Sequence, residues 1–290
     1  MIKQVDTSQI TAIEKSRQSK VLVFACSNVE IDLLPSIFEA LNEIGHSERL
    51  DLVLYCRGGV VNAARRIILL LHEFTDHLGI LVPHHCESSG TIMTLGAHEV
   101  IAGPLALFSP IDPHLNSGHG GDSDAPGSIA AQDIRLFGEM ARNWFQLDER
   151  DACVQSLSML SGSIFPTTLT SFYRSTLELK EISEQLLAKQ LPDESLETRT
   201  KIINQLLFGF HSHSYFLTRD EMKELGLNVL LQPEIEPFIW QISQDIAGLI
   251  GSGLRKAPDD PWNDTLIATA EVSRVRQRQP DTIYPNWIKI

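Results

Sequence analysis

Cysteine is scarce in this sequence, and its few occurrences form no metal or disulfide motif. The four cysteines are Cys26, Cys56, Cys86 and Cys153, and none of them has CxxC or other metal-ligand spacing. Three of them end short apolar runs, which is typical of buried structural thiols. We therefore expect reduced cysteines, no metal site and no cofactor.

Long apolar runs are also missing. The first covers residues 21–25 and is far too short to cross a bilayer, and no later run is long enough. The opening twenty residues are polar and do not resemble a secretory signal peptide. The sequence predicts a soluble, cytoplasmic protein with no membrane partner.

Basic residues are outnumbered by acidic ones. The 290 residues include 24 Lys and Arg against 37 Asp and Glu, a formal net charge of −13. Such a charge repels phosphate and argues against nucleic acid as the main partner. The basic cluster Arg274, Arg276 and Arg278 stands apart. We interpret it as a solvated helix face or tail, with docking to an acidic partner as the alternative.

Apolar runs typical of strands alternate with helical patterns over the first hundred residues. Strands are expected at 20–26, 50–55, 79–83 and 100–102, and helices at 7–18, 32–44, 62–78 and 89–98. This alternation predicts βαβ units and a mostly parallel sheet covered on both faces, hence an α/β fold.

The chain changes character after Pro104. Residues 109–127 are rich in Gly, Pro, Ser and Asp and predict a long functional loop. Helices are then expected at about 130–160, 168–189, 197–208 and 218–226, with a short strand at 228–231. We divide the chain into an N-terminal helical segment (1–19), a main domain (20–250) and a C-terminal extension (251–290).

Two short motifs carry the chemistry. Residues 57–61 (RGGVV) and residues 86–91 (CESSGT) each follow an expected strand and precede a helical pattern. A glycine pair lets backbone N–H groups point at a developing oxyanion, and a serine at a helix start can serve as a nucleophile. Delivered together to the ends of strands, these are the parts of an acyl-transfer site.

With these motifs located, the chain resembles the ClpP/crotonase superfamily, and within it the serine dehydrogenase proteinase family, relatives of signal peptide peptidase A. The resemblance is carried by LDLVLYCRGG at residues 50–59, CESSGT at 86–91 and SPIDPH at 109–114. A fourth match spans HSYFLTRDE at 213–221 and LGLNV at 225–229.

The resemblance implies a ClpP/crotonase-like fold of repeated β-β-α and βαβ units with helical C-terminal elaboration. It also implies a serine protease, a hydrolase that cleaves peptides or proteins and forms a homo-oligomer. Ser88 corresponds to the nucleophile, and the N–H groups of Gly59 and Ser89 correspond to the oxyanion hole. Gly58 and Val60 complete the turn beside which an extended substrate would pair as a strand.

The general base departs from the family pattern. The family lysine position is occupied by Ala131, and no lysine occurs between Ser88 and Lys180. Histidine is the alternative base at neutral pH, and His114 and His119 are the candidates. If neither acts, the protein is a pseudoprotease that serves as a binding or assembly module. An acyl-CoA enzyme of the crotonase branch is a weaker third possibility.

Several further charged or metal-binding side chains have ordinary explanations. Arg57 could bind a carboxylate, or could be a surface or interface side chain. Glu87 is expected to point away from Ser88. Four further histidines complete no metal-binding spacing and are expected to be packed or exposed: His84, His85, His211 and His213.

Overall fold

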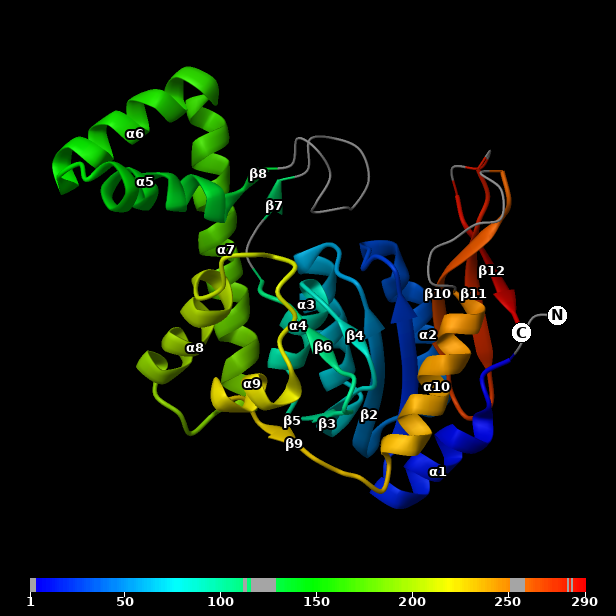
Figure 1. Ribbon diagram of the computed structural model, residues 1–290. Helices are drawn as coiled ribbons and strands as arrows, with labels where there is room; N and C mark the ends of the chain where they lie inside the picture. Colours follow the sequence, from blue (N-terminus) through cyan, green and yellow to red (C-terminus); the bar gives the residue numbers. More distant parts are fainter. Residues whose placement is uncertain (1–3, 112–113, 116–128, 251–258, 281, 283) are drawn as a thin grey trace.

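The computed structural model describes residues 4–111, 114–115, 129–250, 259–280, 282 and 284–290, with only the backbone for 114–115 and 129–130 (Figure 1). The first half contains α1 (Thr7–Arg17), β1 (Lys20–Cys26), the 3-10 helix η1 (Ile31–Leu33), α2 (Leu34–Ile44), β2 (Ser47–Cys56), α3 (Val61–His72), β3 (Thr75–Val82), β4 (His85–Cys86), α4 (Ser89–Leu95), β5 (Glu99–Ala102), β6 (Leu107–Phe108) and β7 (His114–Leu115). The second half contains β8 (Ile129–Ala130), α5 (Ala131–Phe145), α6 (Glu149–Ser163), α7 (Pro166–Gln190), α8 (Leu196–Phe208), α9 (Arg219–Glu224), β9 (Val229–Leu230), α10 (Glu236–Leu249), β10 (Trp262–Ala268), β11 (Ser273–Arg278) and β12 (Asn286–Lys289).

A central sheet organises the molecule. Its main path runs β12-β11-β10-β1-β2-β3-β5-β9, and β4 pairs with both β2 and β6. The strands from β1 to β9 along this path are parallel, whereas β10, β11 and β12 are antiparallel. The predicted α/β class and the largely parallel sheet are therefore confirmed.

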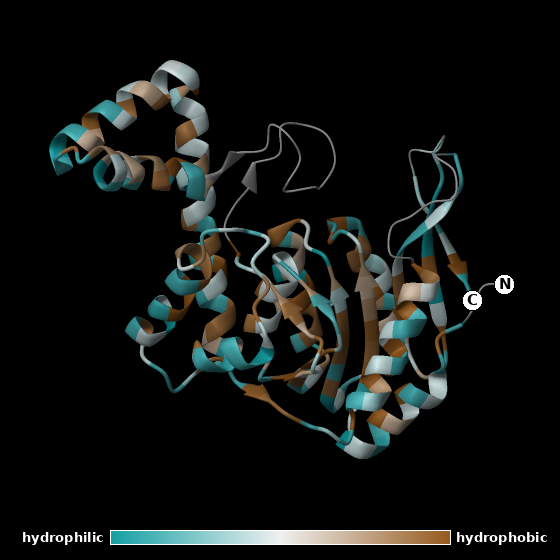
Figure 2. Cartoon of the chain, in the orientation of Figure 1, coloured by the Kyte–Doolittle hydropathy of each residue, from teal (hydrophilic) through white to brown (hydrophobic). Residues whose placement is uncertain are grey.

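The sheet is buried on both faces, as its apolar strands require. Along β1, Leu22 and Phe24 point into a core built with α2, α3, α4, α7 and α8. Val21 and Val23 point into a second core built with α1 and α10. Figure 2 shows the hydrophobic colour gathered in the central strands, between the two helical layers.

Two expected helices have different bounds in the structure. The helix expected at 62–78 ends at His72, and the next strand already begins at Thr75. The single helix expected over 130–160 is a hairpin of two helices, α5 and α6. This hairpin projects with the start of α7 away from the sheet (Figure 1). The hairpin and the start of α7 together expose several large apolar side chains: Trp144, Phe145, Val154, Leu157, Met159, Phe165 and Tyr173.

The C-terminal residues extend the main sheet. β10 pairs with β1, so residues 262–289, which we assigned to a C-terminal extension, share a sheet with the main domain. The expectation of a solvated helix face or tail for the arginine cluster is wrong. Arg274, Arg276 and Arg278 alternate along strand β11, and Arg276 is only 1% exposed.

Within the described ranges, every helix is too short or too polar to span a bilayer.

A histidine cluster lies at the start of β5. His98 stacks on His77 with ring centroids 4.8 Å apart and meets His72 edge-on at 5.3 Å. Its Nδ1 accepts a 2.9 Å hydrogen bond from the Leu78 N–H. Burial, together with the neighbouring histidines, lowers the pKa of His98 from 6.5 to about 4.

This shift predicts a pH-dependent stability. The unfolded chain binds the His98 proton at a higher pH than the native chain does. The contribution of neutral His98 to the free energy of unfolding is therefore full above pH 6.5 and declines as pH falls toward about 4. We expect the His98→Gln variant to show a shallower dependence of the free energy of unfolding on pH in this window, measured by urea denaturation. His46→Gln, at an exposed histidine, is the control and should keep the wild-type slope. Equal slopes for wild type and His98→Gln would contradict the prediction.

Candidate active site

The glycine turn is fixed by Val29, which lies in the segment between β1 and η1. The Val29 N–H donates to the Gly58 carbonyl, and the Val60 N–H donates to the Val29 carbonyl, both at 2.8 Å. A Cβ placed on Gly59 would lie 2.2 Å from the Val29 nitrogen. Gly58 and Gly59 also have φ values of +114° and +137°, which side chains disfavour. Glycine is therefore required at position 59 by both space and backbone angle.

Ser88 occupies a strained strand-to-helix turn. It follows β4 and precedes the first residue of α4, with φ 51° and ψ −111°. A non-glycine residue with such angles costs roughly 1–3 kcal/mol, and such strain concentrates at functional sites. The same type of turn exposes the nucleophile of α/β-hydrolases. Ser88 therefore has a backbone conformation of the kind that clusters at functional sites.

Two buried hydroxyl groups hold this turn. The Ser88 N–H donates to the Ser109 Oγ at 2.7 Å. The Ser109 N–H donates to the Thr91 Oγ1, which itself donates to the Cys86 carbonyl. The strain at Ser88 is thus balanced by hydrogen bonds within a buried neighbourhood. Ser109 and Thr91 were not predicted, although Ser109 begins the SPIDPH motif.

The structure brings the two predicted motifs into contact. A Cβ on Gly58 would lie 3.2 Å from the Ser88 Cβ and 3.6 Å from its Oγ. The Ser89 hydroxyl donates to the Gly59 carbonyl at 2.6 Å. The proposed nucleophile and the proposed oxyanion turn therefore face each other directly.

The backbone N–H groups at this junction fall into two sets. The Gly58 N–H contacts the Cys56 Sγ at 3.3 Å, and the Val60 N–H is bonded to Val29. The N–H groups of Gly59 and Ser89, in contrast, have no acceptor among the residues that the structure describes. These are the two donors that the sequence assigned to an oxyanion hole. Val60 contributes an exposed side chain beside them.

Three of the four cysteines belong to the hydrophobic core beside this site. Cys26, Cys56 and Cys86 are buried, as predicted, whereas Cys153 is exposed. Burial raises the pKa of the Cys26 and Cys86 thiols, which keeps them protonated.

A row of three neighbouring polar side chains borders the site. The Arg57 Nη2 lies 3.4 Å from the His85 Nε2, and the His85 Nδ1 is hydrogen-bonded to the Glu87 carboxylate. This row links the residue before Gly58 to the residue before Ser88. Burial, followed by the charges of His85 and Arg57, lowers the pKa of the adjacent His84. The sequence signal was the alternation of His85 and Glu87, since residues two apart in extended backbone share a side.

The candidate bases are only partly described. The backbone of His114 in β7 pairs with Ala130 in β8, one residue before Ala131 at the start of α5. The His114 side chain and the whole of His119 lie outside the described residues. The described residues contain no group of three or more His, Cys, Asp or Glu side chains able to hold a metal ion.

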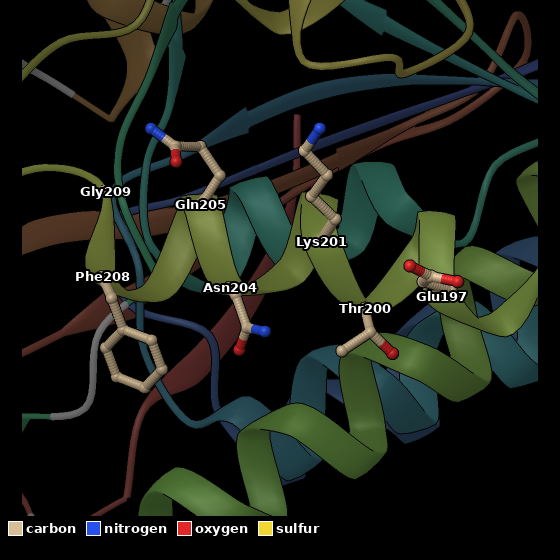
Figure 3. Close-up of a pocket in the computed structure, with 7 residues that line it drawn as sticks. All are labelled: Glu197, Thr200, Lys201, Asn204, Gln205, Phe208 and Gly209. Atoms are coloured by element: carbon tan, nitrogen blue, oxygen red, sulfur yellow. The ribbon is translucent and has the colours of Figure 1, made fainter.

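A separate open pocket lies along α8, and none of the predicted site residues line it (Figure 3). Its lining residues are Glu197, Thr200, Lys201, Asn204, Gln205, Phe208 and Gly209.

The first part of the chain is similar to a known protein family. Residues 2–121 match the family model of the ClpP-like SDH-type serine proteinases. The matched stretch includes both the glycine turn and Ser88, so the predicted family resemblance is confirmed.

Two archaeal proteins are similar over a longer stretch. The uncharacterized proteins MJ0137 and MJ1495 of Methanocaldococcus jannaschii are 24% and 23% identical to this chain over 201 residues. The aligned region is 69% of this chain but only 60% and 59% of the relatives. The chain therefore spans less than two thirds of their length.

Among solved structures, the 1510-N membrane-bound stomatin-specific protease is similar at 15% identity and a TM-score of 0.45. The alignment covers 77% of this chain and 84% of that one.

Proposed function

We propose that this protein is a serine peptidase that hydrolyses peptide bonds through Ser88. The observation that carries the proposal is the strained Ser88 turn packed against Gly58, with the N–H groups of Gly59 and Ser89 beside it. A strained turn is maintained only where the surrounding structure holds it, and here the surroundings are the parts of an acyl-transfer site. The family of residues 2–121 supports the same chemistry.

The reaction would proceed through an acyl-enzyme. The Ser88 Oγ attacks the peptide carbonyl carbon while a base removes the hydroxyl proton. The N–H groups of Gly59 and Ser89 stabilise the oxyanion, and the base then delivers its proton to the leaving amine. Water attacks the resulting ester, and the second product leaves as a carboxylic acid.

We propose His114 as the base, with His119 as the second candidate. The support for His114 is its register, because the residue paired with it is adjacent to Ala131, where the resemblance places the family lysine. A histidine there could replace the missing amine from the facing strand. An imidazole near its ordinary pKa suits a base at neutral pH.

A pseudoprotease remains the second candidate function. It is favoured by Ala131 and by the Ser88 hydroxyl, which has no base hydrogen-bonded to it among the described side chains. In that case the same turn would bind peptide without cleaving it.

Peptide hydrolysis by single histidine variants tests the base. We expect the His114→Ala variant to lower kcat by about 10²–10⁴-fold, the typical contribution of a general base. His119→Ala should keep most activity, and His46→Ala, at an exposed histidine in the α2–β2 connection, is the matched control. Unchanged turnover in His114→Ala would reject His114, and loss in His119→Ala alone would assign the base to His119.

A homo-oligomer is also part of the proposal. The projecting helices α5, α6 and α7 expose apolar side chains such as Trp144, Leu157 and Phe165, which a second copy could cover. Sedimentation analysis of wild type and a Leu157→Ser variant tests this surface. A monomer at all concentrations would contradict it.

A further inference from the structure

Two arginines of strand β11 form an ion network that is buried at Arg276 and Asp264 and reaches the surface at Arg278 and Asp32. Arg276 donates to Asp264 at 2.8 and 2.9 Å and lies 2.9 Å from the Glu30 carboxylate. Arg278, which is 29% exposed, binds the same Glu30 oxygen at 2.6 Å and also pairs with Asp264. Asp32 completes the network at 3.2 Å from Arg276. One carboxylate, that of Glu30, is therefore shared by two guanidinium groups.

Glu30 is adjacent to the residue that clamps the glycine turn. Val29 makes the two backbone hydrogen bonds to Gly58 and Val60, and its nitrogen is the atom closest to the missing Gly59 Cβ. Any displacement of Val29 would therefore move the Gly59 N–H.

The segment between β1 and η1 has little regular structure of its own. Outside the single bridge between Val29 and Gly59, residues 27–30 belong to no strand or helix. At its start, the Ser27 N–H and hydroxyl both donate to the Asp264 carbonyl, at 2.9 and 3.1 Å. At its end, Glu30 is held by the two arginines. The hydrogen bonds to Ser27 and the ion pairs to Glu30 come from β10 and β11, respectively, which lie beyond the family match to residues 2–121.

We propose that Arg276 and Arg278 are positioning residues of the oxyanion hole, acting through Glu30 and Val29 on the Gly59 N–H. This inference rests on the proposed function of the Ser88 site. It assigns a role in the chemistry to C-terminal strands that carry none of the motifs. Arg278 is the better residue to test, because Arg276 is almost fully buried and holds the buried Asp264 through two hydrogen bonds, so its loss would destabilise the fold itself.

Arg278→Ala, with Arg274→Ala as the matched control, tests the proposal. Arg274 lies on the same strand but pairs with Glu39 and Glu43 of α2 instead of the 27–30 segment. Removal of an oxyanion donor costs about 10²–10³-fold in kcat, so a displaced donor should cost about tenfold, with KM nearly unchanged. Arg278→Lys should recover most of this loss, and Arg274→Ala should behave as wild type.

Hydrogen exchange separates this inference from the proposed function. Arg278→Ala should speed amide exchange in a peptide covering residues 57–61, whereas Arg274→Ala should not. If the wild-type protein does not hydrolyse peptides but Arg278→Ala still exchanges faster at 57–61, the positioning role stands and the peptidase proposal fails. Unchanged exchange at 57–61, or equal kcat values for the two alanine variants of an active enzyme, would overturn the positioning role.

Discussion

The Gly59→Ala variant should unfold at a much lower urea concentration than wild type and should lose reaction with an active-site phosphonate. The added methyl group would lie 2.2 Å from the Val29 nitrogen and 2.5 Å from its carbonyl oxygen. Both are backbone atoms, so relief requires breaking the hydrogen bonds that fix the turn. With the cost of φ +137° added, we expect a loss of about 3–5 kcal/mol in the free energy of unfolding.

Gly45→Ala separates the two causes of this loss. Gly45 also has a positive φ of +74°, but a Cβ there would meet nothing within 4 Å. Its replacement should therefore cost only about 1–3 kcal/mol, the cost of a backbone conformation (ψ 178°) that is nearly restricted to glycine, with activity retained. If both variants lose the same stability, the clamp by Val29 does not constrain the turn as we describe.

Replacing Ser88 should separate activity from stability. Ser88→Ala and Ser88→Gly should both reduce peptide hydrolysis by at least about 10³-fold, since both remove the nucleophile. Ser88→Gly should nevertheless be more stable than Ser88→Ala by about 1 kcal/mol, because glycine accepts the φ of 51° without strain. Urea denaturation of the two variants measures this difference.

Gln18→Gly is the control for a positive φ outside the site. Gln18 also has a φ of 51° at the end of α1, but its ψ of 46° places it in the left-handed helical region, and it is exposed and lies in a different part of the fold. Its replacement should leave hydrolysis unchanged. Equal stability of Ser88→Ala and Ser88→Gly would contradict a strained Ser88 turn.

The sequence predicted the first half of the fold well because apolar pattern and burial agree there. The runs at 20–26 and 50–55 became β1 and most of β2. Helix α3 ends at His72, although we expected it to reach residue 78. The prediction was too long because β3 begins with polar residues such as Asp76 and His77, which do not show the apolar pattern of a strand. The arginines of β11 alternate with period two, a strand signal that their charge concealed.

The candidate site was predictable where it depends on residue type. Gly58, Gly59 and Ser88 stand in short motifs whose chemistry requires those residues, and the structure places them together. Val29 could not be predicted, because it contributes only backbone atoms and lies thirty positions from Gly59. The ion network of Glu30 joins segments more than two hundred positions apart, a relation that no local pattern expresses.

The central claim is that Ser88 is a reactive nucleophile beside a formed oxyanion hole. Intact-mass measurement and peptide mapping after treatment with a fluorophosphonate at neutral pH test it most directly. We expect one phosphonate per chain, attached to Ser88 and absent from Ser88→Ala. No adduct on the folded wild-type protein, or an adduct on another residue that persists in Ser88→Ala, would contradict it.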